Sequence, residues 1–268
     1  MPELPEVETI RNDLEPLLVG RRVTRVDLLV ELDFQARYVR LDEAVGRSIR
    51  ALRRRGKYLI ADLGDRELIV HLGMTGQVGV KATDPGLKHL RVAFTLDDGA
   101  VFFFADQRRF GKIHVVAPGD YAAMPTLAEM GPEPMEKEFR FEPFAAAMST
   151  ASNVKAVLLS QKPVSGLGNI YVDEALHLAK IHPARGHLTR AEAKRLFQAI
   201  PQVLSTGITN RGTTFKDYRD GMGNYGTNQD FLLVYDRAGE PCRTCQTPII
   251  KLRVAQRGTY VCPRCQRP

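Results

Sequence analysis

Four cysteines near the C-terminal end constrain the fold of this chain more than any other feature. They form two pairs, each with two residues between its members, and sixteen residues lie between the pairs: Cys242, Cys245, Cys262 and Cys265. This spacing is typical of a structural site in which four thiolates bind one Zn²⁺ ion. A redox role is the weaker alternative, because paired spacings joined by a predicted hairpin explain all four cysteines. The sequence therefore predicts a zinc finger that binds one structural zinc ion.

The predicted finger places an arginine at the end of a β-hairpin. Residues 249–254 and 259–261 read as two strands, so Gln256, Arg257 and Gly258 lie at or near the tip. An arginine there is suited to probing a nucleic-acid groove.

Composition indicates a multidomain protein with a polyanionic partner. A chain of 268 residues with 44% hydrophobic content predicts two domains and a small appendage. Lys and Arg outnumber Asp and Glu by 38 to 31, which gives a net charge of +7 and favours a polyanion as partner. The acidic N-terminal segment is no signal peptide, and no apolar run approaches the ~20 residues that span a bilayer. We expect a soluble, cytoplasmic monomer.

The N-terminus could carry chemistry. If Met1 is removed, the nitrogen of Pro2 becomes a secondary amine that can attack an aldehyde carbon and form an iminium. Glu3 could supply the proton that such a reaction needs. A helix is predicted from Pro5, with Val7, Ile10, Leu14, Leu17 and Leu18 on one face and Gly20 just past its end. In the alternative interpretation, the Met-Pro start has no chemical role, because many proteins begin this way, and Pro5 only begins a helix. These residues alone favour the alternative.

Residues 23–116 predict an antiparallel sandwich or barrel built on that helix, with strands at 23–30, 58–63, 68–72, 91–96, 101–104 and 112–116. A basic segment, Arg53 to Lys57, reads as a loop that brings Lys57 to a strand start. His71 lies in an apolar run, where a hydrogen-bonded core histidine is the commoner outcome.

Phe110 lies beside Arg108 and Arg109 between two strands. It could insert into a base stack or pack back onto the sheet, and both interpretations stay open.

The second half of the chain is mainly helical. Five prolines between residues 118 and 143 indicate an interdomain connection, and helices are predicted at 144–160, 170–180 and 189–206. Asn169 is a candidate N-cap after a glycine-rich turn that could present amides to a phosphate. Residues 207–230 read as a functional lid or a disordered loop. The predicted domains are residues 1–130, residues 131–235 with a flexible lid at 207–230, and residues 236–268.

Six segments together resemble the family of bacterial formamidopyrimidine-DNA glycosylases, in order from the first residue to the last. They are residues 2–6, 55–59, 71–74, 108–111 and 166–171, and the four-cysteine finger. The resemblance implies an α+β fold: an N-terminal antiparallel β-sandwich carrying the N-terminal helix, then a helix-two-turn-helix domain with a β-hairpin zinc finger. It implies binding of damaged double-stranded DNA, excision of oxidised purines such as 8-oxoguanine and formamidopyrimidines, and strand cleavage by β,δ-elimination. Such an enzyme would act at the bacterial nucleoid.

The resemblance also assigns roles to individual residues. It makes Pro2 the nucleophile at C1′, Glu3 the general acid and Lys57 a proton donor that touches a phosphate. It makes Met74, Arg108 and Phe110 the wedge that fills the gap left by the flipped nucleotide. The residues it implies as DNA contacts are His71, His89, Lys155, Asn169 and Arg257, and Arg257 also takes part in elimination.

Two alternatives stay open. A sister enzyme that resembles endonuclease VIII would prefer oxidised pyrimidines, although Leu4 and the predicted wedge argue against it. A zinc-finger DNA-binding protein without catalysis would retain Met1. One departure from the family pattern is the segment 148–153, which lacks the basic cluster that some relatives have there.

Overall fold

The computed structural model describes residues 1–83 and 86–268, and its contacts divide the chain into two compact units. Unit 1 comprises Met1–Ala128 and Ile208–Gln229, and unit 2 comprises Glu129–Gly207 and Asp230–Pro268. The segment predicted as a lid on the helical domain therefore packs with unit 1 over most of its length. None of the described helices combines the length and apolar character needed to cross a bilayer.

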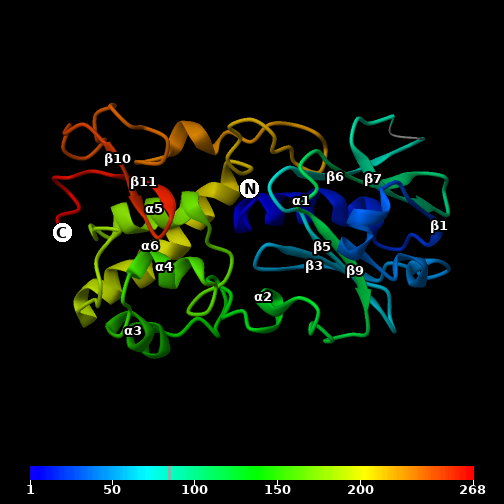
Figure 1. Cartoon of the computed structure of the whole chain (residues 1–268), viewed down its shortest axis with the longest axis horizontal. Helices are drawn as coiled ribbons and strands as arrows, with labels where there is room; N and C mark the ends of the chain where they lie inside the picture. The colour runs from blue at the N-terminus through cyan, green and yellow to red at the C-terminus, as the bar shows by residue number, and fades with distance from the viewer. Residues whose placement is uncertain (84–85) are drawn as a thin grey trace. The chain divides into compact units, whose positions relative to one another are not determined.

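Unit 1 combines two β-sheets with one long helix, α1 (Figure 1). One sheet has the strand order β1-β7-β8-β6 and the other β2-β9-β5-β4-β3, and every pairing is antiparallel apart from β2 with β9, which is parallel. The helices and strands of this unit are α1 (Leu4–Leu18), β1 (Val23–Leu28), β2 (Tyr38–Val39), β3 (Ala51–Arg55), β4 (Tyr58–Asp62), β5 (Glu67–His71), β6 (Gly76–Lys81), β7 (Leu90–Leu96), β8 (Val101–Asp106), β9 (Lys112–Val116) and α2 (Pro125–Ala128). Two 3₁₀ turns, at Leu32–Arg37 and Leu41–Ala44, join β1 to β3.

Helix α1 is held between the sheets by its apolar face. It contacts β3 and β4 of one sheet and β6 of the other. Val7, Ile10, Leu14 and Leu18 are each no more than 1% exposed and belong to the same core as side chains from both sheets. Leu17, predicted on this face, is 36% exposed because its neighbour Leu18 continues the row from Leu14 at the four-residue spacing of a helix.

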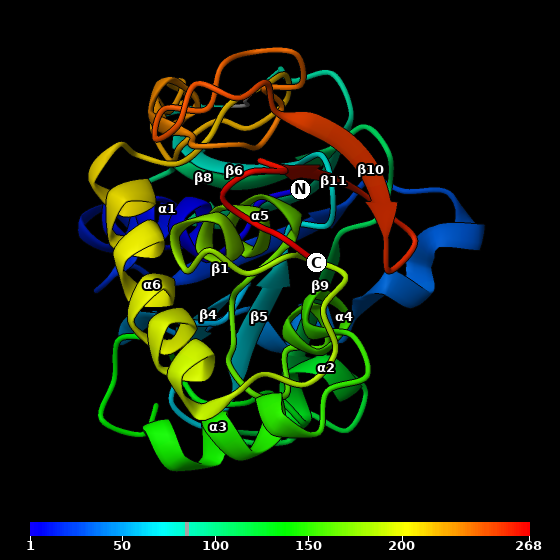
Figure 2. The same ribbon diagram turned by 90° about the vertical axis from the view of Figure 1, so that its left-hand side faces the viewer.

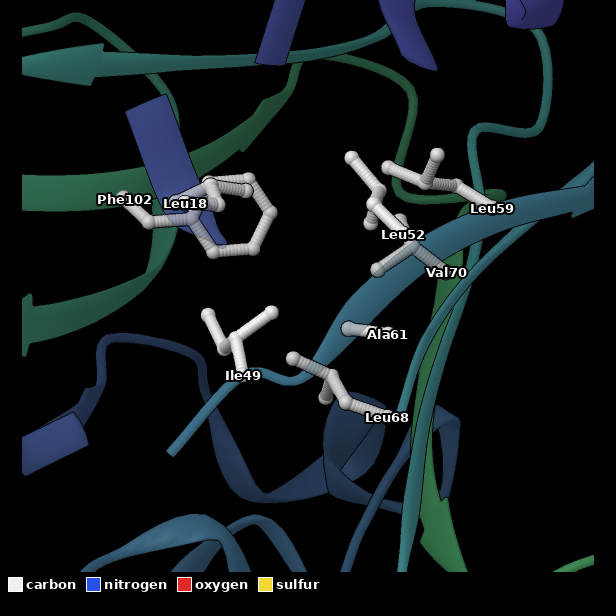
Figure 3. A pocket seen from close by; sticks show the side chains of 8 residues that line it. All are labelled: Leu18, Ile49, Leu52, Leu59, Ala61, Leu68, Val70 and Phe102. Atoms are coloured by element: carbon white, nitrogen blue, oxygen red, sulfur yellow. The ribbon is translucent and has the colours of Figure 1, made fainter. Parts of the chain in front are cut away.

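The core of unit 1 contains a small cavity lined only by apolar side chains (Figure 3). The lining residues are Leu18, Ile49, Leu52, Leu59, Ala61, Leu68, Val70 and Phe102. A bound water needs two or more polar partners, and a substrate site needs groups that orient the ligand. The cavity offers neither, so it is a packing gap rather than a binding site.

Unit 2 combines helices with the finger hairpin, which lies beside α5 (Figure 2). Its elements are α3 (Phe141–Ser149), α4 (Val154–Leu159), α5 (Asn169–Leu178), α6 (Arg190–Thr209, whose last two residues are in unit 1), β10 (Ile250–Val254) and β11 (Arg257–Val261). A 3₁₀ turn at Asn228–Phe231 leads from unit 1 into unit 2. The two sheets of unit 1, together with the helices and the hairpin of unit 2, confirm the predicted α+β fold.

Three local predictions were wrong. Residues 53–55 form the end of strand β3 rather than a loop, because they pair with residues 58–60 of β4. Two of the arginine side chains form ion pairs, Arg54 with Glu8 at 2.7 Å and Arg53 with Glu67. The helix predicted at 144–160 is broken at residues 150–153, where the Asn153 side chain accepts a hydrogen bond from the Ala156 amide and caps α4. Asn169 is the first residue of α5, and Gly168 is its N-cap.

Candidate DNA-binding site and metal centre

The start of α1 is buried and hydrogen-bonded. Pro2 is buried and Glu3 is 2% exposed. The Glu3 amide donates to Glu6 Oε2 at 2.8 Å, and the other oxygen of Glu6 accepts from the Thr213 amide at 2.8 Å. Glu6 therefore ties the N-terminal segment to the loop that follows α6.

Two contacts fix the direction in which α1 runs along β3. Near the end of α1, Leu18 lines the same cavity as Leu52 on β3. Closer to its start, Glu8 accepts a hydrogen bond from Arg54. The helix traced back from Leu18 to Glu8 therefore follows β3 toward the β3–β4 turn. Residues 2 and 3 lie toward this end of the sheet.

Lys57 occupies that turn and is 8% exposed. Gly56 precedes it with a φ of 54°, the left-handed conformation that the first residue of a tight two-residue hairpin turn requires. Glycine at this position thus lets the chain reverse within two residues. The turn directs Lys57 to the same end of unit 1 as Pro2 and Glu3.

His71 lies on the strand next to this turn. Its ring packs against the Tyr58 ring in a tilted arrangement, with 4.7 Å between the ring centroids. Burial, with smaller contributions from the charges of Lys57 and Lys112, lowers the pKa of His71 to about 4. The imidazole is therefore neutral at pH 7, where it can donate one hydrogen bond but carries no charge.

Buried Asp106 holds together two loops that carry predicted wedge residues. Its carboxylate accepts hydrogen bonds from Thr75 Oγ1 at 2.5 Å, from the Arg108 amide at 3.2 Å and from the Gly111 amide at 2.8 Å. The backbones also touch, because a Cβ added to Gly73 would lie 2.6 Å from the carbonyl carbon of Phe110. The loops at residues 73–75 and 106–111 therefore form one rigid surface.

Three side chains project from this surface. Met74 is 39% exposed, Phe110 is 43% exposed, and the exposed Arg108 guanidinium lies over the Phe110 ring at 4.9 Å. The exposure of the ring favours the interpretation in which Phe110 is available to a ligand over the one in which it packs back onto the sheet. His89 is half-buried beside this surface, where its carbonyl accepts from the Asp106 amide at 3.0 Å.

The loop after α6 is anchored at its base and exposes apolar side chains beyond it. Arg211 pairs with Asp13 of α1 at 2.7 Å and with Asp220 at 2.5 Å. Phe215, Met222 and Tyr225 are between 45% and 62% exposed. The ion pairs of Arg211 thus hold the base of this loop, while its outer residues expose apolar side chains.

In unit 2, the hairpin tip packs on the start of α5. Ala255 and Gln256 both have positive φ, which makes a tight turn and places exposed Arg257 as the first residue of β11. The Asn169 side chain donates to the Gly258 carbonyl at 2.9 Å. Asn169 and Arg257 are therefore neighbours at the N-terminal end of a helix, where the helix dipole favours an anion.

Lys155, predicted to contact DNA, is 0% exposed. Its ammonium group donates to Asp173 at 2.6 Å and to Thr259 Oγ1 at 2.8 Å, and the Asp173 carboxylate also accepts from the Tyr260 amide at 2.9 Å. In this arrangement Lys155 cannot reach a phosphate. Instead, it holds the strand that begins at Arg257.

The four cysteines converge as the spacing predicts. Their sulfur atoms all lie within 4.8 Å of one another, with Cys242 and Cys265 4.0 Å apart and Cys245 and Cys262 3.4 Å apart. Tetrahedral zinc with Zn–S bonds of about 2.3 Å requires sulfur atoms roughly 3.8 Å apart. The four thiolates fit one structural Zn²⁺, and none of the four forms a disulfide.

Sequence reasoning missed the buried acids that position these sites. Asp106 orders the loops of unit 1, and Asp173 orders the hairpin of unit 2. Glu174 accepts hydrogen bonds from the amides of residues 233, 234 and 235 at 2.7 to 2.9 Å, which fixes the entry to the finger. Acidic residues are mostly exposed, so an isolated Asp or Glu in a sequence gives no sign of such a role.

Comparison with known proteins defines the class of this fold. Residues 1–113 match the formamidopyrimidine-DNA glycosylase N-terminal domain, residues 130–219 match the H2TH domain of the same enzymes, and residues 239–268 match a zinc finger found in FPG and IleRS. The fold is thus that of a helix-two-turn-helix protein with a zinc finger.

Full-length relatives agree. The chain is 49% identical to the formamidopyrimidine-DNA glycosylase of Symbiobacterium thermophilum, with 99% of this chain and 89% of that protein covered. It is 47% identical to the Deinococcus radiodurans enzyme, with 99% and 97% covered. The crystal structure of MutM (Fpg) from Thermus thermophilus superposes with a TM-score of 0.91 at 41% identity, covering 99% of this chain and 98% of that one. A Lactococcus lactis Fpg complex with DNA containing an abasic site gives a TM-score of 0.89 at 34% identity, covering 99% and 100%. This chain belongs to the formamidopyrimidine-DNA glycosylase family.

Proposed function

We propose that this chain is a bifunctional DNA glycosylase and AP lyase of base excision repair that removes oxidised purines and then nicks the DNA. Family membership supports the glycosylase activity. The observation that carries the finer proposal is the placement of Pro2 and Glu3 at a buried helix start that lies toward the turn holding Lys57.

The proposed nucleophile is the nitrogen of Pro2. With Met1 in place this nitrogen is an amide, whose lone pair is delocalised, so the chemistry requires removal of Met1. The free secondary amine attacks C1′ of the damaged nucleotide, the bond from C1′ to the base breaks, and the sugar ring opens to an iminium. The iminium draws electrons from C2′, whose proton is lost as the 3′-phosphate leaves, and a second elimination expels the 5′-phosphate.

Glu3 and Lys57 are the proposed proton donors. A carboxyl group one peptide bond from the amine can protonate the sugar ring oxygen as the ring opens. Lys57 at the β3–β4 turn supplies a second proton and binds a phosphate by charge. Neutral His71 would contact a phosphate as a hydrogen-bond donor, which is consistent with its lowered pKa.

The exposed Met74, Arg108 and Phe110 are the proposed wedge. The target C1′ is shielded in a duplex, so the nucleotide must leave the stack at a cost of a few kcal/mol. An aromatic ring and a thioether that occupy the vacated space offset part of this cost. His89 beside them would contact the backbone.

In unit 2, we propose that Arg257 and Asn169 bind a phosphate at the start of α5, and that Arg257 also assists elimination. Lys155 contributes by holding the hairpin rather than by touching DNA.

The loop from residue 212 to 225, in unit 1, would cover the flipped base. The protein would act as a monomer at the nucleoid.

The relatives' ligands support oxidised purines as substrates. Lactococcus lactis Fpg variants have been solved with DNA containing Fapy-dG, and a MutM with DNA containing carbocyclic 8-oxo-G. These are formamidopyrimidine and 8-oxoguanine lesions, the two classes that we assign to this chain.

A cleavage assay on duplexes with defined lesions tests the proposal. Purified protein, shown by intact mass to lack Met1, should release 8-oxoguanine and formamidopyrimidine bases and leave phosphates on both sides of the gap. Glu3→Gln should lose base release but retain nicking at a preformed abasic site, where the aldehyde is already available. Glu15→Gln, on an exposed part of the same helix, is the matched control and should behave as wild type. Preference for oxidised pyrimidines, or binding without cleavage, would contradict the proposal.

A further inference from the structure

Helix α5 presents a histidine to the metal centre. His177 is 4% exposed, and its Nε2 lies 3.5 Å from the Sγ atom of Cys242. It follows Asp173 and Glu174 by one helical turn, so the three side chains share one face of α5. Asp173 and Glu174 already hold the hairpin and the entry to the finger. His177 extends this contact face to the thiolates themselves.

The surroundings of the ring determine which nitrogen carries the proton. Nδ1 of His177 is buried and has no hydrogen-bond partner among the described residues. A proton there would be a buried donor without an acceptor, which is unfavourable. Nε2 faces sulfur, and a metal-bound thiolate can only accept. The proton therefore belongs on Nε2, pointing at Cys242.

We propose that His177 is a positioning residue of the zinc site, whose Nε2–H donates a hydrogen bond to the Cys242 thiolate. Backbone amides of Thr244 and Cys265 also approach cysteine sulfurs at 3.4 Å, as expected within the finger's own turns. His177 differs because it comes from a helix outside the finger. Its hydrogen bond withdraws electron density from the sulfur, fixes the orientation of Cys242 and joins the metal centre to α5.

This role concerns retention of the metal and is independent of the chemistry proposed at Pro2. The test compares zinc-loaded, full-length wild type with His177→Phe, which keeps a ring but has no donor, and His177→Gln, which keeps an N–H. His187→Phe is the control, because His187 is exposed on the loop after α5. In excess chelator, His177→Phe should release zinc about tenfold faster than wild type. His187→Phe should match wild type, and His177→Gln should recover much of the retention.

A spectroscopic measurement separates hydrogen bonding from packing. With cobalt(II) in place of zinc, loss of the donor raises the energy of the sulfur lone pairs. The sulfur-to-cobalt charge-transfer band of His177→Phe should therefore move to lower energy, while that of His187→Phe stays in place. A wild-type release rate, or faster release with an unmoved band, would show that the ring only fills space and would overturn the proposal.

If His177→Phe does not fold, the zinc-loaded wild type decides the question. Nitrogen-15 spectra of the histidine side chains should show Nε2 of His177 protonated and Nδ1 unprotonated. The opposite tautomer would overturn the proposal.

Discussion

Phe110 is exposed on a loop that hydrogen bonds to Asp106 hold in place, so its side chain can be removed without disturbing the sandwich. Phe110→Ala should reduce kcat/KM on a paired 8-oxoguanine by roughly tenfold or more, because stacking of an aromatic ring on a base contributes ~1–3 kcal/mol. Cleavage of a preformed abasic site should change much less, since there is no base to extrude.

Single-turnover kinetics on the two duplexes measure this difference. Phe231→Ala, which removes a 52% exposed phenylalanine elsewhere, is the matched control and should affect neither substrate. If Phe110→Ala lost the same fraction of its activity on both duplexes, Phe110 would not be part of the wedge.

His71 gives a residue-level prediction about pH. Its pKa in the folded protein is about 4, below the ordinary value of 6.5, so the unfolded chain binds more protons at mildly acidic pH. The contribution of His71 to the free energy of unfolding is therefore fully present above about pH 6.5. It is lost as the pH falls toward 4, by at most about 1.4 kcal/mol per pH unit. His71→Phe, which keeps a ring beside Tyr58, should lose less stability than wild type between pH 7 and pH 5. Denaturant unfolding at each pH measures this, and parallel curves would contradict the assigned pKa.

At the scale of elements, the buried pair of Lys155 and Asp173 joins α4, α5 and β11. Lys155→Met leaves a buried carboxylate without its cation and should destabilise unit 2 by about 3–5 kcal/mol. Lys162→Met is the matched control: Lys162 is 68% exposed and pairs with Glu129 at the surface, so its loss should cost about 0–1 kcal/mol.

A double-mutant cycle on DNA affinity tests how Lys155 acts. Arg257→Ala should lower the slope of log affinity against log salt by about one phosphate contact. If Lys155 acts only by placing Arg257, Lys155→Met should add little to the loss in Arg257→Ala. Fully additive losses would instead indicate that Lys155 contacts DNA itself.

Strand β3 shows why local sequence reasoning misplaced some elements. Three consecutive arginines read as a solvated loop, because nothing local identifies Glu8 and Glu67 as their partners. The strands with apolar runs, such as β8, were predicted because burial on both faces is visible in the sequence itself.

For the whole molecule, the sequence predicted the features that depend on the spacing and order of residues along the chain. The two cysteine pairs defined the metal centre, and the order of short motifs identified the family. What it could not predict depends on tertiary contacts: the burial of Lys155, the acids that hold each loop, and the packing of residues 208–229 with unit 1. These follow from residues far apart in the chain, such as Arg211 and Asp13.

The proposed reaction depends on the N-terminal amine of Pro2, and covalent trapping identifies the amine that reacts. Sodium borohydride added during turnover on an 8-oxoguanine duplex should reduce the iminium and join protein to DNA, and the modified peptide should begin at Pro2. A variant with extra residues ahead of Pro2 has an amide there, so it should bind lesion DNA but neither trap nor cut it. Trapping that maps to Lys57, or that persists in the extended variant, would contradict the role of Pro2 as the nucleophile.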